Sequence, residues 1–341
     1  MLIRVGILTA PHIEWEQKEH TFVLKDVRIG IGFHWDRKED QEFQGTLEIR
    51  NNADGTQTAI NTLDLEDYLT SVISSEMSAD SPIELLKAHA VISRSWALRA
   101  IAKPNHEGFD VCADDHCQRY EGLRRRNERA VQAVKATAGQ VLMYGEEICD
   151  CRYYKCCGGK TEIWSTCWED KDVPYIRSVD CPYCGRASER TLRLVLNDYD
   201  QETRDFHDWQ VSYTAEELSE IIRTKTGIDF GEIIDLIPLK RGASGRIYEL
   251  KIVGSKHAET ISKELNIRYA LSPKCLYSSW FDVEKDPSYI AHPSFILRGH
   301  GWGHGAGLCQ IGAAVMAAEG KSYEEILSFY YANSRLSVTA Q

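Results

Sequence analysis

One glutamate in the first half of the chain is placed for acid–base chemistry. In the stretch Leu65–Met77 the apolar residues recur at helical spacing, so they share one face of an amphipathic helix. Glu76 lies on the same apolar stripe, in the last turn of that helix. Burial and the negative end of the helix dipole both disfavour an ionised carboxylate at this place. A carboxyl group that keeps its proton near neutral pH can act as a general acid, and we expect this role for Glu76.

Two consecutive helices are expected to position this glutamate. Asp64 is the predicted N-cap of the first helix. The second helix is expected to begin with Ser81 as N-cap, Pro82 at the first helical position and Glu84 completing a capping box. Residues 83–101 are apolar nearly all round, which predicts that the second helix is buried.

Other interpretations of these reactive residues remain open at the level of sequence. Glu76 could instead be a structural carboxylate that forms an ion pair with Arg94 or another cation, because perturbed carboxylates are often structural. A cysteine hydrolase using Cys309 or Cys157 with His304 is a weaker hypothesis. No ordered pattern of cysteine, histidine and aspartate or asparagine supports it.

A short run of soft ligands predicts a metal site. The segment CADDHC brings Cys112, His116 and Cys117 within six residues, and thiolate with imidazole suits zinc. One short cluster supplies at most three ligands, so water or a distant residue must complete a tetrahedral site. The alternative is a surface loop whose cysteines are incidental.

A second group of cysteines follows between residues 148 and 185. Cys181 and Cys184 have the spacing of a metal knuckle, and nearby cysteines could supply the partners of a second, structural zinc. The candidate set is Cys156, Cys157, Cys167, Cys181 and Cys184. A disulfide or free thiols are the alternatives.

The overall composition limits the classes of function. The chain has 341 residues, of which 43% are hydrophobic and 27% charged, and its net charge of -11 argues against a dedicated nucleic-acid-binding protein. No run of about 18 apolar residues predicts a membrane-spanning helix. The N-terminus lacks a convincing signal peptide, and 11 clustered cysteines fit metal ligands or reduced thiols better than a disulfide framework. These features favour a cytoplasmic location over the cell envelope.

The predicted fold class is α+β. Residues 1–60 read as a β-rich lead-in, and residues 61–190 as a mainly helical catalytic core with a cysteine-rich segment. Residues 191–290 change character and are expected to form an inserted α+β accessory region. Residues 291–341 contain a Gly-rich loop and helices that complete the core, so antiparallel β-rich regions are expected to flank the helices.

Several separated blocks resemble the sporulation stage II protein D family, which includes amidase enhancers of the LytB type. The blocks are DYLTSVISSEM, SPIELLKAHAVISRSWALR, RGASGR and GHGWGHGAGLCQIGA, and the resemblance extends over most of residues 60–335. A further block, Cys157–Glu162, departs from the family pattern, because it has a cysteine where the family usually has a serine.

The resemblance implies an activity and a catalytic residue. Catalytic members of the family are lytic transglycosylases of peptidoglycan, and their catalytic glutamate lies in a Ser-Glu-Met motif that Glu76 matches here. Such an enzyme needs one carboxyl group, which protonates the glycosidic oxygen and then accepts the proton of the C6 hydroxyl as a 1,6-anhydro ring closes. A two-carboxylate hydrolase would need a second group, with Asp110, Asp114 and Asp115 as first candidates.

The resemblance also implies ligands and partners. Some members bind zinc near the cleft through a Cys and a His, and Cys112 and His116 are favoured here, with Cys117 as a competitor. The expected partners are glycan strands or fragments of peptidoglycan. The alternative function is a non-catalytic, glycan-binding enhancer of a cell-wall amidase. The predicted substrate-binding residues are Ser75, Met77, Arg94, Gln118, Tyr120, Gly158, Gly159, His304 and Gln310.

Overall fold

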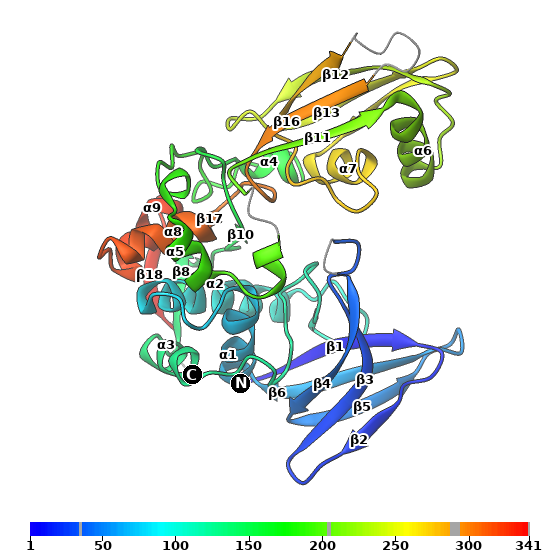
Figure 1. Cartoon of the computed structure of the whole chain (residues 1–341). Helices are drawn as coiled ribbons and strands as arrows, with labels where there is room; N and C mark the ends of the chain where they lie inside the picture. The colour runs from blue at the N-terminus through cyan, green and yellow to red at the C-terminus, as the bar shows by residue number, and fades with distance from the viewer. Residues whose placement is uncertain (34–35, 203–205, 287–293, 340–341) are drawn as a thin grey trace.

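The computed structural model describes residues 1–33, 36–202, 206–286 and 294–339 (Figure 1). The chain combines helices and strands, so the predicted α+β class is confirmed. The expected boundary between residues 290 and 291 lies outside the described residues. Within them, no helix has the length and apolar character needed to cross a membrane.

The N-terminal region consists of two antiparallel-rich sheets packed on the first helices (Figure 1). One sheet has the order β5-β6-β1-β7 and the other the order β2-β3-β4. Apolar residues alternate along β1 and β3 and form one core with the first two helices. The strands are β1 (Leu2–Ala10), β2 (Trp15–Gln17), β3 (Thr21–Ile29), β4 (Arg37–Gln44), β5 (Thr46–Asn51), β6 (Gln57–Asp64) and β7 (Val111–Cys112).

Helix α1 (Leu65–Glu76) leads directly from β6 and ends at the predicted glutamate. Asp64 caps it as predicted, because its carboxylate accepts a hydrogen bond from the Glu66 amide. The next helix, α2 (Ile83–Ala102), is buried along most of its length, also as predicted. Its predicted capping box is wrong, because the Ser81 hydroxyl has no partner there. The carboxylate of Glu84 instead accepts from the Tyr323 amide, so it joins α2 to the C-terminal part of the chain.

The C-terminal segment returns to the helices and completes their core. Helix α3 (Glu128–Ala136) packs against α1 and α2, while α8 (Gln310–Ala318) and α9 (Tyr323–Tyr330) pack on the other part of α2. Three strands of one sheet, in the order β18-β8-β9, hold the chain end against this core. These strands and the neighbouring pair are β8 (Gln140–Tyr144), β9 (Glu147–Ile148), β10 (Tyr153–Tyr154), β17 (Leu308–Cys309) and β18 (Arg335–Val338).

Between these parts lies a region with its own hydrophobic core, at the top of Figure 1. Its two sheets have the orders β11-β16-β15 and β12-β13-β14, and α6 and α7 cover them. The Gly-rich stretch at residues 298–307, which is the loop expected in the C-terminal block, begins as strand, because β16 includes residues 298–300. The elements of this region are α4 (Trp164–Cys167), β11 (Asp208–Thr214), α6 (Ala215–Thr226), β12 (Ile233–Arg241), β13 (Ile247–Gly254), β14 (Ala258–Ser262), α7 (Glu264–Ala270), β15 (Phe281–Asp286) and β16 (Ser294–His300). The preceding helix, α5 (Glu189–Val195), packs against α8 in the helical part.

Glu162 fastens this region to the helical part. Its carboxylate accepts hydrogen bonds from the Ala243 amide at 2.9 Å, the Ser244 amide at 3.0 Å and the Ser244 hydroxyl at 2.6 Å. Arg246, which is fully buried, donates to the carbonyl of Gly303 at 3.2 Å. Three motifs that are far apart in sequence therefore meet at one joint, which fixes the glycine-rich segment before α8.

Candidate functional site

Glu76 combines burial with an oxygen to which no group of the described residues donates. It is the last residue of α1 and is 8% exposed. Its Oε1 accepts hydrogen bonds from the Arg119 amide at 3.0 Å and from the Tyr153 hydroxyl at 2.9 Å. Across the part of the chain that the structure describes, no group donates to Oε2 and no cation forms an ion pair with this carboxylate. The arrangement fixes one oxygen and leaves the other for a ligand.

The alternative ion pair between Glu76 and Arg94 is wrong. Arg94 is 1% exposed and forms a bidentate pair with Glu66, with Nε–Oε1 and Nη2–Oε2 distances of 2.8 and 2.6 Å. Glu66 lies in the first turn of α1 and Glu76 in its last, which corresponds to about 15 Å along the axis at 1.5 Å per residue. Arg94 is therefore held at the opposite end of the helix from Glu76.

The carboxylates near Glu76 are paired with cations. Asp115 forms an ion pair with Arg119 at 3.0 Å, and Asp200 forms one with Lys155 at 2.7 Å. Lys155 also donates to the backbone carbonyl of Glu76 at 3.2 Å, so its charge lies at the end of α1. Glu76 differs from these neighbours because its carboxylate has hydrogen-bond donors and no cation partner among the described residues.

Tyr153 is supported by a buried polar chain that the sequence did not reveal. The ring of His89 packs edge-on against Tyr153, with centroids 4.6 Å apart. The Gln310 amide donates to His89 Nε2 at 3.0 Å, so the imidazole carries its proton on Nδ1 and donates to Ser93 at 3.1 Å. Burial lowers the pKa of His89 to about 3 and raises the pKa of Tyr153 well above its usual value. His89 therefore stays neutral, and Tyr153 stays a donor to Glu76.

His304 holds the backbone of the same tyrosine. Its Nδ1 accepts from the Ala306 amide at 3.1 Å, and its Nε2 donates to the Tyr153 carbonyl at 3.0 Å. Burial lowers the pKa of His304 well below its usual value, so the ring is neutral in this role. The structure thus joins His304 and Gln310 to the surroundings of Glu76 through Tyr153.

The other predicted substrate-binding side chains are mostly enclosed. Gln118 is fully buried and accepts from the Tyr68 hydroxyl at 3.1 Å, while Tyr120 is 2% exposed and donates to Asn61 at 2.7 Å. Ser75 and Met77 flank Glu76 and are also buried. Their arrangement supports the loop and the helix end, and direct contact with a glycan stays a prediction.

Gly158 and Gly159 lie where the chain must pass close to another backbone. Gly158 has φ of 74°, and a Cβ atom there would lie 2.7 Å from the amide nitrogen of Gly301. A glycine is therefore required for the two segments to approach. Their predicted role in glycan binding is not tested by this packing.

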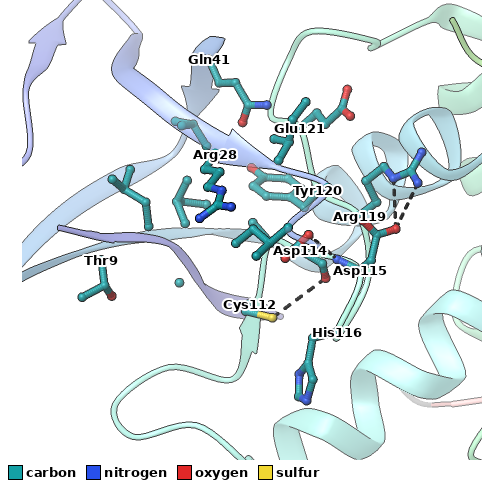
Figure 2. A pocket seen from close by; sticks show the side chains of 18 of the residues that line it. Thr9, Arg28, Gln41, Cys112, Asp114, Asp115, His116, Arg119, Tyr120 and Glu121 are labelled. Carbon is teal, nitrogen blue, oxygen red and sulfur yellow. Dashed lines mark hydrogen bonds and ion pairs between the residues drawn. The ribbon is translucent and has the colours of Figure 1, made fainter. Parts of the chain in front are cut away.

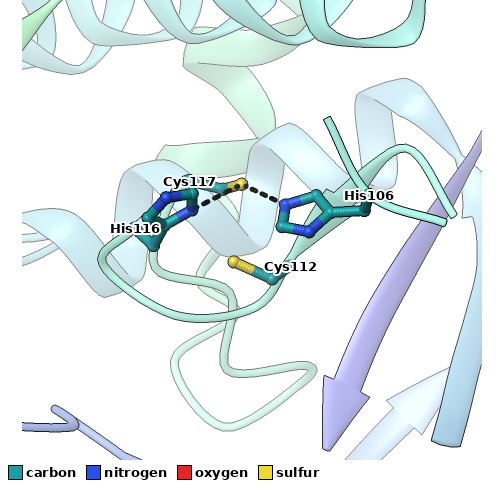
Figure 3. Close-up of side chains that lie close together, drawn as sticks. All are labelled: His106, Cys112, His116 and Cys117. Carbon is teal, nitrogen blue, oxygen red and sulfur yellow. Dashed lines mark hydrogen bonds between the residues drawn. The ribbon is translucent and has the colours of Figure 1, made fainter. Parts of the chain in front are cut away.

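The predicted metal ligands converge, and a fourth residue joins them (Figure 3). His106, Cys112, His116 and Cys117 place their ligand atoms within 4.8 Å of one another. The Cys117 sulfur lies 3.2 Å from His106 Nε2 and 3.8 Å from His116 Nδ1. A tetrahedral zinc with bonds of 2.0–2.3 Å separates sulfur from nitrogen by about 3.5 Å. The four side chains therefore fit a single metal ion of the Cys2His2 type.

This group lies beside the loop that reaches Glu76. The contact between the two thiols lowers the pKa of Cys112, with a further hydrogen bond from His116, and raises the pKa of Cys117, so one thiolate is shared between the two sulfurs. Cys117 is two residues before Arg119, whose amide binds Glu76. His106 was missed in the sequence because it follows α2 and stands outside the CADDHC segment.

A cavity of about 290 Å³ lies between the N-terminal strands and this loop (Figure 2). His106, Cys112 and His116 are among its lining residues, and Glu76 is not. Asp114 also lines it, and burial raises the pKa of that carboxyl to about 7. The two other suggested partners for a hydrolase are engaged elsewhere, since Asp110 accepts from the Arg4 amide at 2.8 Å and Asp115 pairs with a cation.

The second cysteine group differs from the expected set. Cys157, Cys181 and Cys184 converge as expected, but the fourth member is Cys309. The predicted members Cys156 and Cys167 lie outside the group of four. Cys167 instead donates to the His304 carbonyl at 3.3 Å. The cysteine-hydrolase hypothesis gains nothing, because His304 binds backbone groups through both ring nitrogens.

Comparison with known proteins relates this chain to a family. Residues 53–144 match the family described as Stage II sporulation protein. An uncharacterized protein of Brachyspira hyodysenteriae is 31% identical over 291 residues, covering 85% of this chain and 71% of that protein. Stage II sporulation protein D of Bacillus subtilis is 23% identical over 294 residues, covering 82% and 76%. The chain belongs to the stage II sporulation protein D family.

Two further matches extend beyond this segment. Residues 162–307 match a domain of unknown function (DUF8618), and they include the accessory sheets. The amidase enhancer of Bacillus subtilis is 26% identical over 301 residues, which cover 79% of this chain but 40% of that protein. The Stage II sporulation protein segment contains Glu76, Arg119 and the four residues of the Cys2His2 group.

Proposed function

We propose that this member of the stage II sporulation protein D family is a peptidoglycan lytic transglycosylase with Glu76 as its single acid and base. The arrangement of Glu76 carries the proposal: a carboxyl group at a buried helix end, with one oxygen held by two donors and the other without a donor in the part of the chain that the structure describes. The neighbouring Asp115 and Asp200 are bound to cations and are poorly suited to serve as a second catalytic carboxylate.

The reaction would use one carboxyl group twice, first as an acid and then as a base. Protonated Glu76 gives its proton to the oxygen between N-acetylmuramic acid and N-acetylglucosamine, and the C1–O bond breaks. The C6 hydroxyl oxygen of N-acetylmuramic acid then bonds to C1, and its proton passes to the Glu76 carboxylate. The products are a 1,6-anhydro end and a free hydroxyl on the departing sugar, with no water consumed. Tyr153 and the Arg119 amide orient the carboxyl group throughout.

His106, Cys112, His116 and Cys117 would hold a zinc ion in this proposal. A bound zinc supplies a fixed cross-link between the end of α2 and the loop that carries Arg119. Glu76 is the proton donor in this proposal. The four ligands contribute by fixing the loop that carries Arg119.

A second function is favoured by one comparison. The relative named amidase enhancer suggests that this chain could grip glycan strands and stimulate a cell-wall amidase without cleaving them. The two functions differ in what happens to the glycan.

Mass spectrometry of purified glycan strands after incubation with the protein separates them. The transglycosylase should leave anhydro ends, lighter by one water than hydrolysed ends. Glu76→Gln should leave the strands intact, because an amide can neither give a proton to the glycosidic oxygen nor accept the proton of the C6 hydroxyl. Reducing ends in stoichiometric amount would indicate a hydrolase. Intact strands with wild-type protein, together with a faster amidase, would establish the enhancer.

A further inference from the structure

Four buried thiols from three distant segments meet in the centre of the fold. Cys157 follows β10, Cys181 and Cys184 form the Cys-Pro-Tyr-Cys knuckle, and Cys309 ends β17 at the start of α8. Three of them are fully buried and Cys184 is 3% exposed. We propose that these four residues bind one zinc ion, as a structural tetrathiolate site separate from the Cys2His2 group.

The distances fit one tetrahedral ion. All four sulfurs lie within 4.8 Å of one another, and those of Cys157 and Cys184 are 3.2 Å apart. Zn–S bonds of about 2.3 Å place the sulfurs of a tetrahedron about 3.8 Å apart. Each cysteine of a [4Fe–4S] cluster binds a different iron atom, which spreads the sulfurs farther than this group allows. A thiolate tetrahedron of this size suits zinc.

The surroundings supply donors to the sulfurs. The Cys157 and Gly312 amides donate to the Cys309 sulfur at 3.2 and 3.3 Å, and the Tyr330 hydroxyl lies 3.3 Å from the Cys181 sulfur. The N-terminal end of α8 also points its positive dipole at the group. Such outer contacts are what bound thiolates need, since they spread the negative charge of the site.

Gly312 shows how closely the helix approaches the sulfurs. A Cβ atom at this position would lie 2.3 Å from the Tyr330 hydroxyl oxygen, 3.0 Å from the Cys181 sulfur and 3.2 Å from the Cys309 sulfur. Only glycine lets the first turn of α8 close over the group. The first turn of α8 therefore packs directly against the cysteine group.

The site would fix the strand that carries Tyr153. Cys309 pairs with Tyr154 between β17 and β10, in parallel register, and Leu308 pairs with Tyr153. The residue after Cys309 is Gln310, which holds His89 against Tyr153. A metal at Cys309 therefore joins the knuckle and α8 to the backbone on which the Glu76 hydrogen-bond donor stands.

Zinc content tests the site in a background without the other group. The full chain with Cys112→Ser and Cys117→Ser, purified under reducing conditions and supplied with zinc, should carry one zinc per chain. Adding Cys184→Ser should reduce this to near zero, and adding Cys184→His should restore it, because Cys3His also binds zinc. Adding Cys275→Ser, a half-buried cysteine outside both groups, should leave one zinc.

Two measurements keep the test valid if Cys184→Ser fails to fold. Cobalt(II) bound to the folded background protein should give the intense sulfur-to-cobalt charge transfer and the ligand-field bands of a tetrathiolate. Denatured without reductant, the same protein should show nine reactive thiols, which is 11 cysteines less the two replaced. A background protein without zinc, or one with seven thiols or fewer, would overturn the site. The result does not depend on glycan cleavage, so the proposed function stands or falls separately.

Discussion

The Tyr153 hydroxyl donates to Glu76 Oε1 at 2.9 Å, although 77 positions of sequence separate the two residues. Glu76 ends a helix of the N-terminal half, and Tyr153 lies on a two-residue strand paired with the C-terminal segment. The contact links the geometry of the glutamate to the assembly of the whole chain. Loss of this hydrogen bond should therefore slow the reaction at Glu76 without disturbing helix α1.

Tyr153→Phe should slow glycan cleavage roughly ten- to hundredfold, because a hydrogen bond to a charged group is worth about 1.5–3 kcal/mol and 1.4 kcal/mol is tenfold in rate. The change should appear in kcat, with KM little altered, since the hydroxyl orients the catalytic group. The matched control is Tyr154→Phe, which removes a buried hydroxyl that has no partner in the described structure. Equal rates for wild type and Tyr153→Phe would remove Tyr153 from the mechanism.

Removing His106 tests the Cys2His2 group. His106→Ala should lower the zinc content by about one per chain and reduce cleavage, because the loop before Arg119 loses its cross-link. Cys112→Ser and His116→Ala should behave in the same way, with the fold largely intact. His257→Ala, which changes a histidine on the β13–β14 hairpin, is the control for loss of an imidazole. Full zinc content in all three ligand variants would exclude the site.

Much of the local structure could be predicted because it depends on neighbours in sequence. The periodicity of residues 65–77 and the Asp64 cap predicted α1 correctly. Strand β4 could not be predicted from its own sequence, since RKEDQEFQ is mostly charged and only Gln41 and Phe43 turn inward to be buried. The Ser81 cap failed because Glu84 found a partner in the C-terminal segment. Tertiary contacts override local signals at both places.

The candidate site was predictable only in part, for the same reason. Glu76 and three of the four candidate ligands could be proposed from residue type and spacing. The Arg119 contact uses a backbone amide, which leaves no mark in the sequence, and Cys309 lies 125 positions after Cys184. His106 is separated from the other ligands by a turn, so spacing alone did not connect it to them. Contacts between segments that are distant in sequence complete each of these sites.

The Arg94–Glu66 pair should contribute to stability rather than to catalysis. Glu66→Gln leaves a buried guanidinium without its bidentate partner, which should lower the free energy of unfolding by about 1–3 kcal/mol. Asp67→Asn is a matched control on the adjacent residue, because the Asp67–Arg126 pair is well exposed and should change stability by no more than about 1 kcal/mol. Urea unfolding measures both. A rate of cleavage by folded Glu66→Gln far below that of wild type would contradict the structural role.

The buried imidazole of His89 predicts a loss of stability in acid. Its pKa in the folded protein is about 3, against the ordinary value of 6.5, and burial is the main cause, with the charge of Lys155 adding to it. Between these values the unfolded chain binds more protons than the folded one, so stability falls as the pH is lowered from 6.5 toward 3 and is full above 6.5. The slope from this one residue should be about 1.4 kcal/mol per pH unit.

Urea unfolding at several pH values between 4 and 7 would measure this slope in wild type and in His89→Gln. The variant keeps an amide that can bond to Gln310 and Ser93 but cannot take up a proton, so its slope should be smaller by about 1.4 kcal/mol per pH unit. His304 is also buried with a lowered pKa, so part of the acid sensitivity should persist in the variant. His12→Gln controls for the loss of a histidine elsewhere. If the slope in His89→Gln equals that of wild type, the imidazole takes up its proton in the folded protein. That result would contradict the lowered pKa that follows from the enclosure of His89 against Tyr153.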